Sequence, residues 1–131
     1  MRILIAEDEE LVANMLKKTL EDQGYSIDLA ENGEVAFEKF KKNSYAIVLT
    51  DIRMPKMDGL ELLKKIKNTE KGKIVDVILI TGYSDIKYSM DALKKGAYDY
   101  FKKPVSRDEL LSTIKRVENK RDIFDGEKAS E

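Results

Sequence analysis

Short apolar runs alternate with amphipathic segments along most of this 131-residue chain. Five runs are too short for a helix. Three of them are rich in branched residues and favour buried β-strands, the run at 26–29 alternates and favours an edge-like strand, and the run at 99–101 favours a short strand. The five runs cover residues 3–6, 26–29, 46–50, 77–80 and 99–101. Apolar residues recur at helical spacing in residues 9–22, near 35–40, in 59–67, in 85–95 and from 106 onward. Five strands alternating with five helices predict an α/β fold whose parallel sheet is covered on both faces.

The order of the strands follows from the rules of chain connection. Right-handed crossovers leave few arrangements, and a five-stranded chain of this size most often takes the flavodoxin-like order 2-1-3-4-5. We therefore expect a three-layer, doubly wound (βα)5 fold. In that order the first and third strands are neighbours, so Glu7, Asp8 and Asp51 converge at one edge of the sheet. Thr81 and Lys103 close later strands and are expected on the neighbouring side of the same crevice.

Several residues mark the ends of the helices. Gly24 and Gly96 each follow a helical pattern and are expected to stop a helix. Asn32-Gly33 indicates a turn. Ser106, with Glu109 three residues later, is a capping box that opens the last helix.

The apolar stripes predict which helix faces are buried. The first helix is expected to bury one face, made of Leu11, Met15, Leu16 and Leu20. The last helix is expected to bury Leu110 or Leu111, Ile114 and Val117.

Two polar segments are expected to lie outside the packed elements. Residues 67–73 are predicted to be a solvated loop. From about Asp122 the helical pattern lapses, which predicts one domain over residues 1–121 and a polar, frayed tail over 122–131 that could begin a linker.

Composition narrows the chemistry. The 24 Lys and Arg residues nearly balance the 25 Asp and Glu, and the net charge of −1 gives no sign of direct nucleic-acid binding. The chain has no Cys and no His, which excludes thiol nucleophiles, zinc sites and Ser-His-Asp triads. Any nucleophile or metal ligand must therefore be an oxygen group or a Lys amine. No run is long enough to span a bilayer and no signal peptide opens the chain, so we expect a soluble, cytoplasmic protein without membrane contact.

The converging acids need a counter-charge. Each pair of carboxylates at ~4 Å repels by about 4 kcal/mol at an effective dielectric constant of about 20. All-oxygen ligation without a full cage favours Mg²⁺, with Mn²⁺ as an alternative. A Lys and a hydroxyl beside the ion would complete a pocket for a phosphoryl group. Asp51 is best placed to attack phosphorus and form an aspartyl phosphate. Asp8 could instead, or in addition, cap the first helix.

Four motifs carry a family resemblance. They are the acid pair Glu7-Asp8, DIRMPKMDG at 51–59, Thr81-Gly82 and DYFKKP at 99–104. In this order, each at the end of a predicted strand, they resemble the receiver domain of two-component response regulators over residues 2–118. Within that family the chain looks most like receivers fused to ATP-dependent transcription activators.

The resemblance implies ligands and a phosphoacceptor. Asp51 resembles the phosphoacceptor. Asp8, aided by Glu7, resembles the Mg²⁺ ligand, and the backbone carbonyl of Arg53 would supply another.

The resemblance also implies a switch. Thr81 resembles the hydroxyl that moves towards the phosphoryl oxygens, and Tyr100 resembles the aromatic residue that turns inward behind it. Lys103 would pair with the phosphoryl group, and Gly82 would leave that group room. Lys103-Pro104 would be a cis peptide.

The function that we expect is a phosphorylation-dependent signalling switch. Its partners would be a sensor histidine kinase or phosphotransfer protein and an output domain or partner protein. The responding face would be made by the fourth helix, the fifth strand and the last helix, through which a homodimer could also form. We expect that the protein is not an enzyme. Its activity would be limited to weak self-phosphorylation from small donors and slow autodephosphorylation.

Two other functions remain open from the sequence. An aspartate-nucleophile phosphatase would want a second acid two residues after Asp51, where Arg53 stands. An interaction domain that does not depend on phosphorylation would keep the fold without needing the acids, the Thr and the Lys. A flavin-binding protein is a weaker alternative, because no phosphate-binding loop follows the first strand.

Overall fold

The structure is a computed structural model that describes the backbone of residues 1–130 and the side chains of residues 1–123. The strands are β1 (Arg2–Ala6), β2 (Ser26–Ala30), β3 (Ile47–Asp51), β4 (Asp76–Thr81) and β5 (Asp99–Lys102). The α-helices are α1 (Glu10–Glu21), α2 (Gly33–Lys42), α3 (Gly59–Lys67), α4 (Ile86–Leu93) and α5 (Arg107–Ser130). Two short 3-10 helices, η1 (Lys71–Lys73) and η2 (Tyr83–Asp85), precede β4 and α4.

All five strands run parallel in the order β2-β1-β3-β4-β5, which confirms the predicted topology. The chain begins in the interior of the sheet, moves to one edge at β2, and returns past β1 to β3. The order therefore reverses between β1 and β3, and the carboxyl ends of these two strands open into a crevice at that point.

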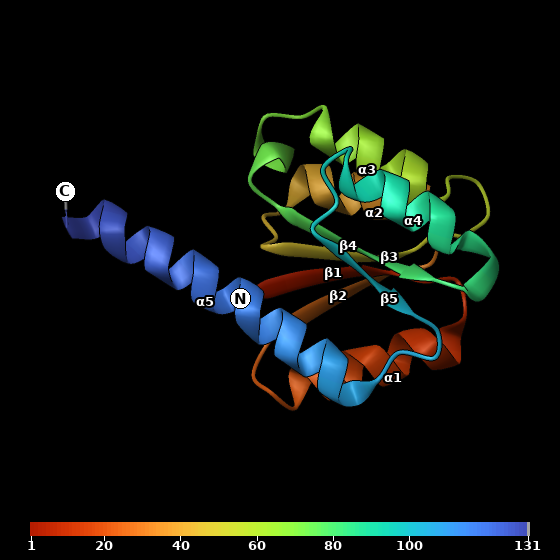
Figure 1. Cartoon of the computed structure of the whole chain (residues 1–131), viewed down its shortest axis with the longest axis horizontal. Coiled ribbons are helices and arrows are strands. Elements are labelled where there is room, and N and C mark those ends of the chain that lie inside the picture. Colours follow the sequence, from red (N-terminus) through yellow and green to blue (C-terminus); the bar gives the residue numbers. More distant parts are fainter. Residues whose placement is uncertain (131) are drawn as a thin grey trace.

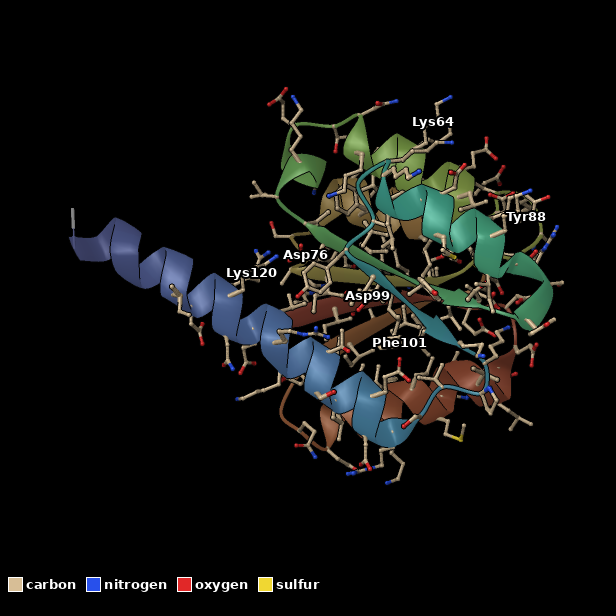
Figure 2. The ribbon with its side chains drawn as sticks, viewed as in Figure 1. Lys64, Asp76, Tyr88, Asp99, Phe101 and Lys120 are labelled. Atoms are coloured by element: carbon tan, nitrogen blue, oxygen red, sulfur yellow. The ribbon has the colours of Figure 1, made fainter. Side chains whose placement is uncertain are left out.

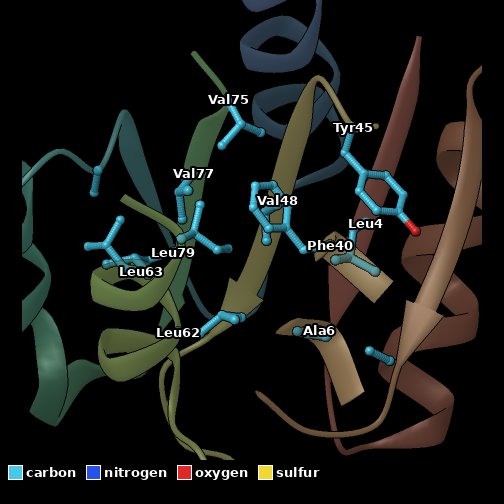
Figure 3. Packing of buried hydrophobic residues seen from close by; sticks show 14 of the residues in the cluster. Leu4, Ala6, Phe40, Tyr45, Val48, Leu62, Leu63, Val75, Val77 and Leu79 are labelled. Carbon is cyan, nitrogen blue, oxygen red and sulfur yellow. The ribbon is translucent and has the colours of Figure 1, made fainter. Parts of the chain in front are cut away.

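The sheet separates two hydrophobic cores. α2, α3 and α4 cover one face and α1 and α5 cover the other (Figure 1). Figure 3 shows the first core, in which strand side chains pack against the helices; it includes Leu4, Val48, Leu79, Phe40 and Leu62. The second core includes Ile3, Leu49, Ile80, Leu20 and Ile114. Because side chains alternate along a strand, consecutive residues of a strand pack into opposite cores.

Local signals place most helix ends as predicted. Gly24 and Gly96 follow α1 and α4 with φ of 93° and 110°, the left-handed conformation in which glycine ends helices. Ser106 Oγ accepts the Glu109 N–H at 3.3 Å at the start of α5. The expected turn at Asn32-Gly33 is instead the start of α2, because the Asn32 side chain accepts the Val35 N–H at 2.9 Å as a helix cap.

The buried face of α1 differs from the prediction. Leu16 and Leu20 are buried as expected, but Leu11 and Met15 are 86% and 66% exposed. Ala13 is buried in their place. The spacing of apolar residues predicts that a segment is helical. It does not by itself predict which side of the helix packs on the sheet, because a small residue such as alanine can lie on the buried side.

The segment from Lys67 to Lys73 is not simply a solvated loop, as had been expected. The Lys67 ammonium donates to the carbonyls of Gly72 and Val75 at 3.0 and 2.7 Å, and Gly72 is buried. Partial burial lowers the pKa of Lys67. The lysine satisfies backbone groups that the turn into β4 would otherwise leave unpaired.

α5 continues further than its apolar pattern. The helix runs to Ser130, past the point near Asp122 where the pattern lapses, and the division into a domain and a polar tail stays a prediction. Figure 2 shows where α5 is fastened to the sheet: Lys120 Nζ lies 2.9 Å from Asp76 Oδ1, and the Arg121 guanidinium donates to the Ile74 carbonyl at 3.0 Å. Leu110, Ile114 and Val117 form the buried stripe as predicted. No helix among the described residues is long and apolar enough to cross a membrane.

Candidate functional site

Three acids meet at the carboxyl ends of β1 and β3. Ala6 and Thr50 are paired in the parallel ladder, so the residues that follow them lie side by side. Glu7, Asp8 and Asp51 each offer a carboxylate oxygen, and these oxygens lie within 4.8 Å of one another. Glu7 and Asp51 are each only 2% exposed, whereas Asp8 is exposed. The convergence expected from the strand order is therefore present.

The environment of Glu7 disfavours the ionised form of its carboxylate. Neither of its carboxylate oxygens has a hydrogen-bond partner, although both are buried. Burial, together with the neighbouring Asp51 carboxylate, raises the pKa of Glu7 to about 8. A buried carboxylate in this condition must either carry a proton, which it can then donate to Asp51, or face a cation.

The donor set fits a hard divalent cation. Two orphaned buried oxygens on Glu7, one exposed carboxylate on Asp8 and one carboxylate on Asp51 give an open, all-oxygen site. Mg²⁺ is bound in such sites by one or two carboxylates and several waters, and its remaining positions can take phosphate oxygens.

Lys103 supplies the positive charge that Asp51 contacts directly. Its Nζ donates to Asp51 Oδ2 at 2.6 Å. Burial is the largest single effect and lowers the pKa of Lys103, but the hydrogen bond to Asp51 and the nearby negative charges of Asp51 and Glu7 together outweigh it, so the pKa of Lys103 is raised. Lys102 is exposed, and the Lys103–Pro104 peptide bond is cis. Strand alternation thus sends the second lysine of the pair into the site.

The loop after β3 holds the other side of Asp51. The Arg53 N–H donates to Asp51 Oδ1 at 3.2 Å. Gly59, the first residue of α3, passes so close to β3 that a Cβ there would lie 2.2 Å from the Asp51 carbonyl oxygen. Asp58 caps α3 by accepting the Glu61 N–H at 2.8 Å. The Asp-Gly pair therefore fixes the loop tightly against the strand that carries Asp51.

Thr81 and Tyr100 lie on the other face of the sheet. Asp51 continues the face of Leu49, which packs towards α1 and α5, whereas Thr81 continues the face of Leu79, which packs towards α4. Tyr100 is paired with Leu79 in the ladder and packs against the same core, half-buried. Thr81 is fully buried, and its hydroxyl donates to the Gly82 carbonyl at 3.1 Å.

Gly82 leaves open space at the end of β4. A Cβ at Gly82 would have no atom within 4 Å, so packing against the protein does not demand a glycine there.

One contact of the site was not expected. The Arg53 guanidinium binds Asp85 through two parallel hydrogen bonds, Nε to Oδ2 at 2.9 Å and Nη2 to Oδ1 at 2.7 Å. The sequence points to Arg53 for its backbone carbonyl and as the residue that replaces the second acid of a phosphatase, and to Asp85 as a helix start. Arg53 and Asp85 lie in different loops, and no local pattern in the sequence indicates that two such residues form a contact.

The alternative role for Asp8 is wrong. The residue at the N-cap of α1 is Glu9, and it makes no side-chain capping bond. Asp8 therefore stands one position too early to cap the helix, and its carboxylate belongs to the acid cluster alone.

The fold and the site together define a doubly wound α/β protein with a paired aspartate at its switch point. The model of the response regulator receiver domain matches residues 3–115, and the chain belongs to this family. Receiver domains are the two-component modules of response regulators, and membership is consistent with phosphorylation-dependent signalling.

Curated relatives are transcriptional regulators that are longer than this chain. The chain is 39% identical over 115 residues to the transcriptional regulatory protein DltR of Streptococcus agalactiae, covering 88% of this chain and 50% of the relative. It is 40% identical over 116 residues to the regulatory protein AtoC of Escherichia coli, covering 88% of this chain and 25% of the relative. The chain thus spans a quarter to a half of these relatives.

Solved structures agree with the fold. A response regulator receiver domain protein from Clostridium thermocellum is 30% identical with a TM-score of 0.87, covering 94% of this chain and 98% of that one. The chemotaxis response regulator CheY4 of Vibrio cholerae is 27% identical with a TM-score of 0.82, covering 88% of this chain and 97% of that one.

Proposed function

We propose that this domain is a phosphorylation-controlled switch in which Asp51 accepts a phosphoryl group from a phosphohistidine. The donor would be a sensor histidine kinase or a phosphotransfer protein in the cytoplasm. The proposal rests on the pairing of Asp51 with Lys103 at 2.6 Å beside two further acids. A structural ion pair alone gives no reason for those acids, because they repel Asp51 and leave Glu7 without a partner.

The transfer forms one bond as it breaks another. An Asp51 carboxylate oxygen bonds to phosphorus while the P–N bond of the phosphohistidine breaks. The imidazole nitrogen keeps the electron pair of that bond and takes up a proton. Asp51 becomes an acyl phosphate. Lys103 already lies against Asp51, so its ammonium can follow the charge onto the phosphoryl oxygens without reorganisation.

Glu7, Asp8, Asp51 and the backbone carbonyl of Arg53 are the proposed ligands of Mg²⁺ or, alternatively, Mn²⁺. When bound, the ion supplies Lewis-acid charge to the phosphoryl oxygens. Glu7 supports this assignment best, because its two buried oxygens have no other partner. The metal would thus relieve the repulsion that otherwise favours a proton on Glu7.

The switch would then pass from Thr81 to Tyr100. The Thr81 hydroxyl now donates to a neutral carbonyl, and phosphoryl oxygens are stronger acceptors. The open space at Gly82 leaves room for the phosphoryl group. As Thr81 turns, Tyr100 on the same face follows, and the face of α4, β5 and α5 changes its preference for an output domain, a partner protein or a second copy.

Hydrolysis of the acyl phosphate should be slow. Arg53 stands where an aspartate-nucleophile phosphatase would place a second acid. The domain would therefore hold the phosphoryl group as a signal and release it by slow autodephosphorylation, with at most weak self-phosphorylation from small donors.

Intact-protein mass after treatment with acetyl phosphate and Mg²⁺ tests the proposal. We expect one added phosphoryl group in the wild type, none in Asp51→Asn, and the wild-type result in Asp22→Asn, a change of an exposed aspartate at the end of α1. An unmodified wild-type mass, or a raised mass in Asp51→Asn, would defeat the proposal. Sedimentation with and without beryllofluoride, a phosphoryl mimic, tests homodimer formation through the α4, β5 and α5 face.

A further inference from the structure

The ion pair between Arg53 and Asp85 joins the two loops that flank the phosphoacceptor. Arg53 lies two residues after Asp51, and its own N–H donates to the Asp51 carboxylate. Asp85 ends η2, in the loop that begins at Thr81. Both oxygens of Asp85 accept from the guanidinium, at 2.7 and 2.9 Å, and the Asp85 side chain is only 5% exposed. Arg53 therefore supplies the charge that a nearly buried carboxylate requires.

Because Asp85 binds Arg53, its side chain does not cap α4. Asp85 stands at the N-cap of α4, where aspartate is among the preferred residues, yet it makes no side-chain capping bond. Its carboxylate is turned to Arg53 instead. The first N–H groups of α4 therefore receive no hydrogen bond from the Asp85 side chain.

α4 is also the most loosely seated of the helices on its face. It is eight residues long, and its buried side chains are only Ser89 and Ala92. The Ser89 hydroxyl is buried without a hydrogen-bond partner. Met90 is 56% exposed, and Figure 2 shows Tyr88 on the outer side of α4. A short, uncapped helix with a small buried face is an element that can take two positions at similar free energy.

We propose that Arg53 transfers its guanidinium from Asp85 to the phosphoryl group on Asp51, and that Asp85, once released, caps α4. This inference rests on the proposed function and adds a second cation, besides Lys103, that binds the phosphoryl group. Arg53 thereby acts as a positioning residue for α4 in the resting state.

Charge explains why the exchange runs in this direction. Phosphorylation replaces the single charge of Asp51 with a group of nearly two negative charges and three strong acceptor oxygens. The Arg53 side chain is 73% exposed, so it can swing between acceptors without leaving a packed core. Asp85 in turn is compensated by the N-terminal N–H groups of α4, where negative charge is favourable. Each group that loses a partner gains another.

Variants of Arg53 and Asp85 separate the two halves of the exchange. Asp85→Asn removes the resting partner of Arg53 and keeps the arginine. Arg53→Gln removes both the ion pair with Asp85 and the proposed contact with the phosphoryl group. The double variant combines the two changes. Arg2→Gln is the control, since the Arg2–Asp28 pair has the same 2.7 Å distance but lies at the opposite end of the strands. The affinity for beryllofluoride in excess Mg²⁺ is measured by titration of backbone amide NMR signals. Thermal unfolding monitors that each variant is folded.

We expect a distinct order of affinities. Asp85→Asn should bind beryllofluoride about tenfold more tightly than wild type, within the usual range of coupling between sites. Arg53→Gln should bind at least about tenfold more weakly than Asp85→Asn, and the double variant should match Arg53→Gln. In Arg53→Gln without the mimic, amide exchange at Lys87 and Tyr88 should slow by about fivefold, the effect of one helix cap. A second double variant combines Arg53→Gln with Asp85→Ala, because asparagine would still cap a helix. It has no capping side chain at that position and should be less protected at both amides.

Other outcomes would overturn the inference. Equal beryllofluoride affinity in wild type, Asp85→Asn and Arg53→Gln would mean that the pair is only structural. Weaker binding by Asp85→Asn than by wild type would mean that Asp85 does not compete with the phosphoryl group for Arg53. A wild type that binds beryllofluoride while the variants do not differ refutes this inference alone, whereas a wild type that binds none refutes the proposed function as well.

Discussion

The unpaired carboxylate of Glu7 should make the metal-free protein lose stability as the pH rises. Burial and the nearby Asp51 raise the pKa of Glu7 from 4.5 to about 8. Between these two values the folded protein keeps a proton that the unfolded chain has released. The stabilising effect of that proton is complete below pH 4.5 and is lost by about pH 8. Glu7→Gln removes the titrating group and should remove this part of the pH dependence.

The size of the effect follows from proton linkage. One proton released on unfolding changes the free energy of unfolding by about 1.4 kcal/mol per pH unit. Over the interval between the two pKa values, about 3.5 pH units, the contribution of Glu7 is about 5 kcal/mol. This is a large part of the stability of an ordinary domain, so the effect is measurable by urea unfolding.

Urea unfolding between pH 5 and pH 8.5 in the presence of EDTA is the assay. The difference between the Glu7→Gln and wild-type free energies isolates Glu7, because the other titrating groups are common to both. The free energy of unfolding of Glu7→Gln, taken relative to that of the wild type, should rise by several kcal/mol from the lowest to the highest pH. Glu21→Gln, a change of an exposed glutamate on α1, should follow the wild type at every pH.

Metal provides the second half of the test. Excess Mg²⁺ binds the ionised acids, so it should stabilise the wild type most at high pH, and wild type and Glu7→Gln should then differ less in slope. Parallel curves for wild type and Glu7→Gln in EDTA would refute the reasoning, since they would mean that Glu7 is ionised in the folded state without a cation.

Three further results follow from other contacts. Lys103→Met should slow phosphorylation of Asp51 by acetyl phosphate about 10²-fold, measured by mass against time, because it removes the cation at 2.6 Å. Gly59→Ala should lower the free energy of unfolding by about 1–3 kcal/mol, because the new Cβ would lie 2.2 Å from a backbone oxygen, whereas Gly82→Ala should change it by less than about 0.5 kcal/mol; equal effects would contradict this. Leu11→Ser should leave the unfolding midpoint in urea nearly unchanged, because the side chain is 86% exposed.

The sequence predicted the fold and the acid cluster well for a physical reason. Asp51 follows a run that can only be a buried strand, and parallel strands bring their carboxyl ends to one edge. Once the strand order is known, the adjacency of Glu7 and Asp51 follows without any knowledge of side-chain packing. Side-chain alternation allows only one of Lys102 and Lys103 to enter the site, and Lys103 is preferred because it precedes Pro104. The contact between Lys103 and Asp51 confirms this choice.

What escaped prediction depends on contacts between distant parts of the chain. Helical periodicity gave the apolar stripe of α1, but only the sheet decides that Ala13 and not Met15 faces inward. Asp85 had the sequence position of a helix cap, and its actual partner, Arg53, is 32 residues away. Local patterns report what a residue can do, whereas tertiary packing selects among those options.

The alternation of β4 has a mechanical consequence. Ile80 and Thr81 are joined by one peptide bond, yet they belong to opposite layers of the molecule. Under the proposed function, Asp51 and Thr81 would act from opposite faces of the sheet, and β4 itself would connect the two faces. Deleting a single residue from β4 ahead of Thr81 would turn the hydroxyl to the opposite face of the sheet. If the proposed function holds, such a protein would still accept a phosphoryl group on Asp51 but would not pass the change to Tyr100.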